Sequence, residues 1–599
     1  MSTMRRLGVY GKNNRTKKSK TVQPSDFSIA GLIGFFERKF KVPFLCNDPD
    51  EAKEIFGDHI SSSNYGWDSL QGFFDNIVGT DGKIYVLSHV GYDGAVYDAV
   101  AATATLLDGS AANTLQVDSA YKGELDYGLS GNRTGYTITN GYRYTTALNG
   151  ATLALDAFVT LDSVIGVTVG DIIRIDDGVP IYKKITSIDE GAQRVNFAGT
   201  VGAIVPDNTA VYVIGFQLKT FRKSISGIVS EVEEELGEIW CTMEPEVTDF
   251  YVENVHAENK WVKGTDLSSV SVLNLSFPAD VATVTYLTTG ADGTTPTLAS
   301  HWSQDLLAFN NKPIRMLANC ETVDVTIQKA IETYCRSRWD NPKTIFNIQE
   351  DRSKAQMQAI GYLYQRSDEV DGVIAADWLK VSDPFATSSI APDREIPNVG
   401  HVMGAWIRTI GLWGIHYVPS IRDISLYGIN GITTSAEFSD GDRTDIAEAG
   451  VNIIQFIQGS GYIIRNFFTP STATEYKFAN GILMKDYIKI SAVDSLQGSE
   501  NTPNSFDRIK EDKTAIVNFL YRLWNVGSTG AVPTGETFGQ SLTDSGVGTA
   551  PEDHFEVVAN TINNPQSSIN LGERNLDVWF TCPTPAGSIR IGVGLWLRS

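Results

Sequence analysis

Cysteine is scarce in this chain of 599 residues. Only five occur: Cys46, Cys241, Cys320, Cys335 and Cys582. The number is odd and the spacings match no zinc-binding pattern, so neither a disulfide framework nor a structural metal site is expected. We expect buried, reduced thiols in a protein made and used in a cytoplasm, and we predict no metal and no cofactor.

Long apolar runs and an excess of basic charge are also lacking. No stretch approaches the ~18 apolar residues of a membrane-spanning helix, so no membrane insertion is expected. The N-terminus has no apolar signal-peptide core, so export by that route is not expected either. Lysine and arginine number 49 against 71 acidic residues, a formal net charge of −22. This balance excludes a simple nucleic-acid binder, because neutralising phosphates requires a basic face.

Catalytic motifs are missing as well. The sequence contains no HExxH, GxSxG or CxxC pattern, and GTDGKI at 79–84 lacks the spacing and hydroxyl of a phosphate-binding loop. Asp440, Asp442 and Asp445 do not fit the twelve-residue calcium loop and are interpreted as a solvated turn and helix cap. We therefore predict no catalytic residue and a structural or assembly protein rather than an enzyme.

Positive charge gathers in the first twenty residues, which contain no acidic residue. The basic side chains of this arm are Arg5, Arg6, Lys12, Arg15, Lys17, Lys18 and Lys20. A basic arm on an acidic body suggests that the arm binds the body of another copy, whereas a solvated tail is the simpler interpretation.

Composition and apolar spacing along the chain predict a mixed α/β protein with a β-rich insertion and extended N- and C-terminal arms. We expect an N-terminal arm (1–25), a first part of the α/β core (26–105), an inserted β-rich domain (106–290), the main core (291–580, its α/β part to about 465) and a C-terminal arm (581–599). Apolar spacing predicts helices over 48–56, 67–78, 322–336, 353–365, 445–458 and 509–524. Strands are predicted over 83–90, 343–348 and 372–381, and in the insertion over 171–176, 181–188, 194–197 and 211–214. Trp378, Trp406 and Trp413 are expected in the core.

The C-terminal arm shows the sharpest local pattern. In SIRIGVGLWLR the apolar residues occupy alternate positions: Ile589, Ile591, Val593, Leu595 and Leu597. Period two describes a strand with one apolar face. Such a strand either closes its own sheet or completes a sheet in a neighbouring subunit.

Several segments together resemble the contractile tail sheath family of phages and related injection machines. The resemblance lies in the order and spacing of the segments 22–57, 377–384 (DWLKVSDP), 391–404 (APDREIPNVGHVMG), 411–419 (GLWGIHYVP) and 450–471. In the last segment, Ile464 and Arg465 stand where the family usually carries Trp-Gly. Residues 106–290 correspond only to the family's variable insertion.

The resemblance implies a structural subunit that polymerises as stacked rings around a tail tube. Both arms would add strands to neighbouring subunits, and contraction would drive the tube through a bacterial envelope for genome ejection. It implies tail tube, baseplate and tail terminator proteins as partners, a place in the virion tail, assembly in the host cytoplasm, and no catalytic triad. The helix over 509–524 is our candidate tube-facing element, through Lys510, Lys513 and Arg522.

Three alternatives stay open at this point. The chain could be the sheath of a non-phage machine, such as a tailocin or a type VI secretion system. It could be a non-contracting tail or surface-layer component. It could also be an envelope-degrading enzyme whose insertion at 106–290 holds a binding module.

Overall fold

A computed structural model provides the fold. It describes residues 21–583 apart from 93–95, 224–232, 258, 269–272, 274, 349–352, 387–391, 421–422, 434–437, 498–501, 526–537, 539–541, 544–545 and 548–550. The basic N-terminal residues and the alternating C-terminal strand predicted from the sequence lie outside the described residues. Within them, no helix is both long enough and apolar enough to cross a bilayer.

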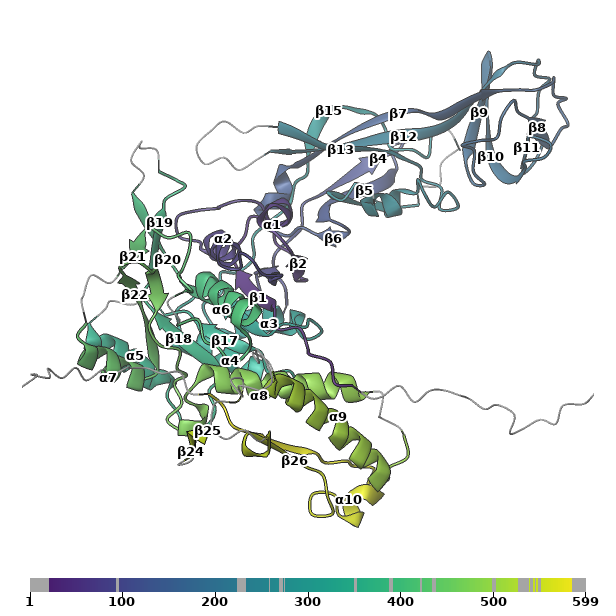
Figure 1. Cartoon of the computed structure of the whole chain (residues 1–599). Helices are drawn as coiled ribbons and strands as arrows, with labels where there is room; N and C mark the ends of the chain where they lie inside the picture. The colour runs from purple at the N-terminus through teal and green to yellow at the C-terminus, as the bar shows by residue number, and fades with distance from the viewer. Residues whose placement is uncertain are drawn as a thin grey trace, which may run out of the picture.

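The core is an eight-stranded sheet with helices on both faces (Figure 1). Its strand order is β2-β3-β1-β16-β17-β18-β22-β23, and only the two edge strands run antiparallel to their neighbours. The strands are β1 (Ile29–Gly34), β2 (Phe44–Cys46), β3 (Lys83–Ser88), β16 (Met316–Asn319), β17 (Lys343–Phe346), β18 (Gly372–Ala376), β22 (Val451–Ile457) and β23 (Gly461–Ile464). The strands before and after the insertion between β3 and β16 therefore belong to the same sheet.

Alternate residues of the central strands supply two different cores. Ile33 and Leu317 point to the face covered by α3 (Ser303–Ala308) and α4 (Val325–Ser337). Leu32 and Ala318 point to the opposite face, where α2 (Gly66–Asn76) and α6 (Val399–Trp413) lie. Burial on both faces explains the continuous apolar runs of these strands. The remaining helices of this part are α1 (Pro49–Phe56), α5 (Lys354–Tyr364) and α7 (Asp440–Glu448).

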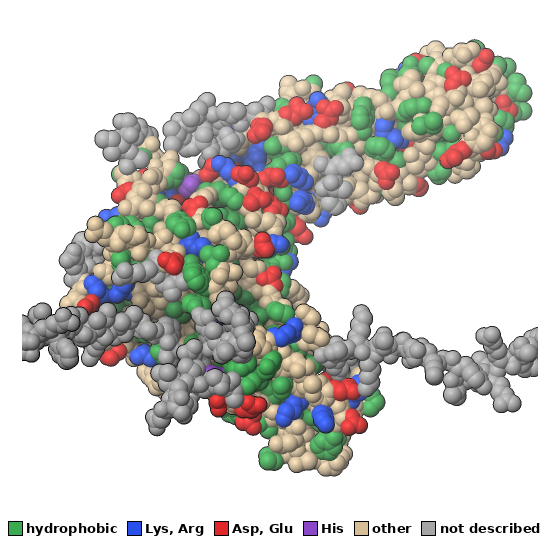
Figure 2. All heavy atoms as spheres, in the orientation of Figure 1, with side chains coloured by type: hydrophobic (Ala, Val, Ile, Leu, Met, Phe, Trp, Pro, Cys, Tyr) green, Lys and Arg blue, Asp and Glu red, His purple; other side chains and the backbone are tan. Residues whose placement is uncertain are grey.

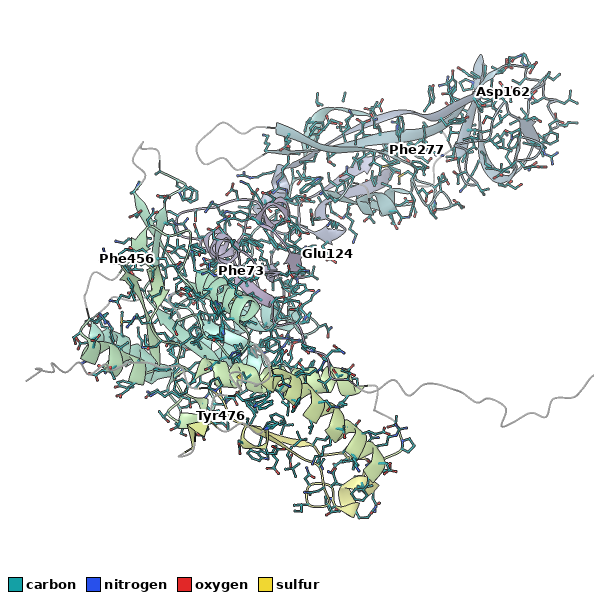
Figure 3. All side chains as sticks on the ribbon, viewed as in Figure 1. Phe73, Glu124, Asp162, Phe277, Phe456 and Tyr476 are labelled. Carbon is teal, nitrogen blue, oxygen red and sulfur yellow. The ribbon has the colours of Figure 1, made fainter. Side chains whose placement is uncertain are left out.

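Helices α2 and α6 cross closely because small residues face each other. A Cβ atom at Gly400 would lie 1.8 Å from the Ser69 carbonyl oxygen, and one at Gly72 would lie 2.1 Å from the His401 ring. The crossing buries Phe73 (Figure 3) and leaves His401 without a polar partner at Nδ1 among the described residues. Burial lowers the pKa of His401 to about 4.

The insertion extends from the core as a long β-rich arm (Figure 1). Its larger sheet has the order β15-β7-β12-β9-β10-β11-β8, with β13 paired to β12, and its smaller sheet joins β14, β5, β4 and β6. These strands are β4 (Thr103–Leu107), β5 (Asn113–Tyr121), β6 (Glu124–Leu125), β7 (Thr134–Ala147), β8 (Phe158–Thr160), β9 (Ile172–Asp177), β10 (Val179–Asp189), β11 (Arg194–Phe197), β12 (Ala210–Lys223), β13 (Glu233–Cys241), β14 (Val262–Asp266) and β15 (Val281–Tyr286). Glu124, Phe277 and Asp162 mark successive distances from the core (Figure 3). Two separate apolar clusters stabilise the near and far halves.

The C-terminal part packs two long helices against the core and a small two-stranded sheet against the helices. It contains α8 (Ala479–Leu496), α9 (Phe506–Trp524), β24 (Leu542–Thr543), β25 (Gly546–Val547), β26 (Phe555–Val558), α10 (Gln566–Asn570) and β27 (Asp577–Phe580). A three-stranded sheet of β19 (Leu379–Ser382), β20 (Asp393–Ile396) and β21 (Gly431–Ile432) lies beside β22 at the edge of the core (Figure 1).

Most sequence predictions of the core are confirmed, and two are wrong. The segment 445–458, predicted as one helix, contains the end of α7 and the strand β22, separated by Gly450 at φ 85°. Val451 to Ile454 are all buried in the parallel sheet, so the strand shows no alternation, and Ile453, Ile454 and Ile457 also fit helical spacing. The predicted strand 372–381 is divided between β18 and β19 at Asp377, whose φ is 82°.

The smaller predictions have mixed outcomes. All five cysteines are free, and four of them are buried. Trp378 and Trp406 lie in the core, but Trp413 is 44% exposed at the end of α6. Asp442 forms a capping box with Ser439 at the start of α7, and both Asp442 and Asp445 pair with Lys354. The helix-cap interpretation is confirmed for Asp442.

Candidate subunit-docking site

Strands β26 and β27 form a sheet of only two strands, and among the described residues neither pairs with a third. Phe555 lies opposite Phe580, and Val557 lies opposite Val578. These four side chains pack toward α8 and α9, whereas Trp579, on the other face, is 67% exposed. Both outer edges thus present backbone N–H and C=O groups that a further strand can pair with.

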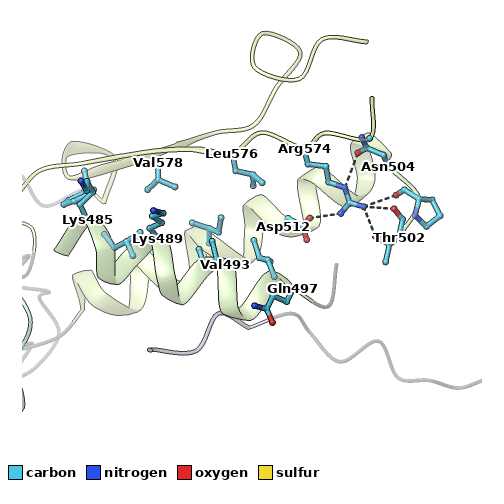
Figure 4. A pocket seen from close by; sticks show the side chains of 17 residues that line it. Lys485, Lys489, Val493, Gln497, Thr502, Asn504, Asp512, Arg574, Leu576 and Val578 are labelled. Atoms are coloured by element: carbon cyan, nitrogen blue, oxygen red, sulfur yellow. Dashed lines mark hydrogen bonds and ion pairs between the residues drawn. The ribbon is translucent and has the colours of Figure 1, made fainter. Parts of the chain in front are cut away.

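An apolar groove runs beside β27. It has a volume of about 1000 Å³ and lies between α8 and the segment 572–580 (Figure 4). Val493 of α8 faces Leu576 and Val578 across it. The apolar lining consists of Ile488, Ala492, Val493, Leu496, Ile516, Leu576, Val578 and Phe580. Since β27 lines this groove and β26 does not, the groove follows the β27 edge of the small sheet.

Arg574 holds one end of the groove in place. Its guanidinium pairs with Asp512 at 3.0 Å and donates to Asn504 Oδ1 at 3.1 Å. It also donates to the Thr502 carbonyl oxygen at 2.9 Å (Figure 4). The side chains of Arg574 and Asp512 are 13% and 3% exposed, so the pair is largely removed from water. This contact ties the strand segment to the α8–α9 connection.

A buried charge cluster joins α8 to the core sheet. Lys343 on β17 lies between Asp371, at 2.6 Å, and Asp486 of α8. Burial opposes the charged form of Lys343, but the two carboxylates outweigh burial and raise its pKa. Glu369, Asp371 and Asp486 could together hold a metal ion by geometry, yet the lysine ammonium already supplies the positive charge there. The cluster is best understood as an anchor for α8.

The two ends of the described chain leave from opposite ends of α8. At the N-terminal end, the Gln23 N–H donates to Ser495 Oγ near the end of α8, and Phe27 packs edge-on against Tyr487. At the C-terminal end, Asn480 in the first turn donates to the Pro583 carbonyl oxygen at 3.0 Å. Fifteen residues of helix separate the two positions by about 22 Å. The first and last described segments therefore lie at opposite ends of α8.

The predicted tube-facing residues lie on α9, whose extent is confirmed. Lys510 is exposed and Lys513 is half-buried. Arg522 is exposed as well, but it donates to the Val22 carbonyl oxygen and so contacts the chain's own N-terminal segment. Lys510, Lys513 and Arg522 stay predictions for contact with a tube.

Sequence reasoning missed the β26–β27 sheet and Arg574. The sequence signal is weak, because FEVV and DVWF each contain a single polar residue and show no regular alternation. Runs of that length are too short to stand out, and their pairing joins residues 19 to 25 positions apart.

Histidine geometry was another feature that sequence reasoning left open. His89 Nδ1 lies 2.5 Å from Asp305 in a buried pair, and His59 lies between Asp58 and Asp68. Although burial opposes it, hydrogen bonding to the two carboxylates raises the pKa of His59. Both histidines therefore have carboxylate partners within the fold.

Comparisons with known proteins return sheath proteins among solved structures. A sheath tail protein from Listeria innocua is 10% identical with a TM-score of 0.48, covering 94% of this chain and 96% of its own. One from Desulfitobacterium hafniense is 9% identical with a TM-score of 0.45, covering 90% and 91%. The contracted sheath of the extracellular contractile injection system PVC is 15% identical with a TM-score of 0.38, covering 47% and 71%. No protein-family model and no curated protein sequence matches the chain.

Proposed function

We propose that this chain is the structural subunit of a contractile tail sheath. The observation that carries the proposal is the small β26–β27 sheet, which pairs with no third strand in the described part of the chain and has an apolar groove beside β27. The chain also carries a terminal segment whose alternating residues 589–597 form one apolar face. A strand of that pattern is complementary to the groove, with its backbone pairing to β27 and its apolar face covering α8.

The occupant of the groove is the C-terminal arm of another copy. Each four-residue edge offers about four backbone hydrogen bonds, each with a net contribution of about 0.5–1.5 kcal/mol. One such contact is weak, but repetition between many copies raises the effective concentration of every arm. Contacts of this kind survive large rigid-body movements while other interfaces repack, which is what a contracting polymer requires.

More specifically, we propose that the subunit belongs to the virion tail of a phage. It would be assembled in the host cytoplasm around a tail tube, between baseplate and terminator proteins. Lys510, Lys513 and Arg522 on α9 would face the tube. Non-phage injection machines use the same kind of polymer, and the identity of the genes beside this one distinguishes the two sources.

Removal of residues 588–599 tests the proposal. We expect a folded, soluble subunit that no longer forms tubes in negative-stain microscopy, while the full chain forms striated cylinders of two lengths. Normal helical assembly of the truncated chain would contradict strand exchange. Rings or lattices of a single fixed length from the full chain would instead indicate a non-contracting component.

A further inference from the structure

A row of aromatic and charged side chains crosses the insertion on three neighbouring strands. Tyr212 of β12 lies opposite Arg174 of β9, which lies opposite Tyr182 of β10. Directly paired residues point to the same face of a sheet, so the register places these three side chains side by side. Asp176, two positions after Arg174, extends the row on the same face.

The row is ordered by stacking and hydrogen bonds. The rings of Tyr142 and Tyr212 stack with centroids 4.1 Å apart and planes 21° apart. The Arg174 guanidinium lies within 6 Å of both ring centroids, donates to the Tyr142 hydroxyl and pairs with Asp176 at 3.0 Å. Tyr142 is nonetheless 42% exposed, and Arg174 and Asp176 are only partly buried. A rigid aromatic surface with polar groups at its margin therefore faces solvent.

A cavity of about 330 Å³ adjoins this surface. Tyr142, Arg174 and Tyr182 line it together with Phe277 and Pro278. Its volume lies at the small end of the range of ligand sites, about 300–1,000 Å³. Phe277 lies midway along the insertion, well away from the β26–β27 sheet (Figure 3). The cavity thus belongs to a separate site on the insertion.

We propose that this site binds a saccharide. Flat aromatic faces cover the C–H face of a sugar ring, and the amphipathic tyrosine also offers a hydroxyl. Arg174 supplies donors and Asp176 supplies acceptors for the hydroxyl groups at the ring edge. A nucleic acid would need several cations beside the aromatic rings, and the site has a single arginine paired with an aspartate. The inference does not depend on the sheath proposal.

Saturation-transfer NMR on the full chain tests this binding, with three soluble probes: a tetramer of N-acetylglucosamine, maltohexaose and a galactan oligosaccharide. We expect at least one probe to bind with a Kd of about 1 mM or tighter, and Tyr142→Ala and Arg174→Ala to weaken it at least about tenfold. Tyr142→Phe should keep most of the affinity, because it retains the stack. The matched controls are Tyr362→Ala, an exposed tyrosine on α5, and Arg194→Ala, which packs on Phe158 elsewhere in the insertion.

Three results would overturn the assignment. One is the lack of saturation transfer to all three probes at about 10 mM, a concentration well above the expected Kd. Another is that Tyr142→Ala and Arg174→Ala bind the sugar as tightly as the two control variants do. The third is binding of a proline-rich peptide at this surface in place of every sugar, which would make the site a peptide groove. Circular dichroism of each variant checks that the fold is retained.

Discussion

At the scale of single residues, the fold depends on a few buried polar groups whose partners are fixed. Arg574 contacts two chain segments at one end of the groove, and Lys343 pairs with two carboxylates between the core and α8. His401 is the opposite case, a buried imidazole whose pKa is lowered because no charge compensates it. Each group makes stability sensitive to one substitution or to pH.

Arg574→Ala should destabilise the subunit by about 2–4 kcal/mol, because it leaves Asp512 buried without its ion-pair partner. Chemical denaturation of the soluble subunit measures the change. Arg508→Ala is the matched control, since its pair with Glu511 is about one-third exposed on both sides and should contribute under about 1 kcal/mol. Equal losses in the two variants would show that Arg574 does not hold the groove.

His401 should make the subunit less stable in acid. Its pKa is about 4 in the folded chain against an ordinary value of 6.5, so the unfolded state binds a proton first as pH falls. Stability is present above pH 6.5 and decreases between pH 6.5 and 4, by about 2 kcal/mol from pH 7 to pH 5. In His401→Gln this part of the pH dependence should vanish in denaturation curves at the two pH values. An unchanged slope would contradict the role of His401.

At the scale of elements, the sequence predicted the helices and strands whose apolar residues recur at a regular spacing. Helices α4, α5 and α9 and strands β3 and β17 lie where apolar spacing placed them. The failure at 445–458 has a physical cause, because a strand buried on both faces has no period and its apolar run also fits a helix. The split at Asp377 depends on a positive φ that a non-glycine residue rarely adopts.

The docking site could be predicted only in part. The alternating strand at 589–597 is visible in the sequence, and its need for a partner follows from its single apolar face. The receiving groove is not visible, because it is made by α8, α9 and β27, whose contact is set by tertiary packing. Arg574 is one arginine among many until the fold brings Thr502, Asn504 and Asp512 around it.

Val493→Arg should block assembly while leaving the subunit folded. Val493 is 41% exposed and lines the groove, so a long charged side chain there would occupy the space of the incoming strand without disturbing the core. Val179→Arg, at an exposed position of the insertion, is the control. Sedimentation should show tubes for the control and free subunits for Val493→Arg. Tubes from both variants would exclude this groove as the docking site.

At the scale of the whole molecule, the core with α8 and the insertion lie in different places. Helix α8 packs beside the core sheet, whereas the insertion extends away from the core (Figure 1). Acidic side chains are distributed over much of the visible surface (Figure 2), in keeping with the net charge of −22. The basic residues of 1–20 therefore have complementary surface available on any neighbouring copy.

Replacement of the seven basic residues of 1–20 by glutamine should weaken assembly at low salt. Exposed charge pairs are screened within about 10 Å at 0.1 M salt, so the full chain should lose assembly as salt rises and the neutral variant should respond less. Light scattering across a salt series measures both. Identical salt dependence in the two proteins would show that residues 1–20 make no electrostatic contribution to assembly.

The C-terminal arm of one copy should pair with β27 of another. This pairing is tested by placing the photo-crosslinker benzoylphenylalanine at Trp579, an exposed position on β27, and co-assembling ¹⁵N-labelled with unlabelled subunits. Mass spectrometry should find crosslinks from position 579 to residues 588–599 that join labelled to unlabelled peptides. Crosslinks to 588–599 that join only peptides of the same label would show that the arm folds back on its own subunit, which contradicts the account.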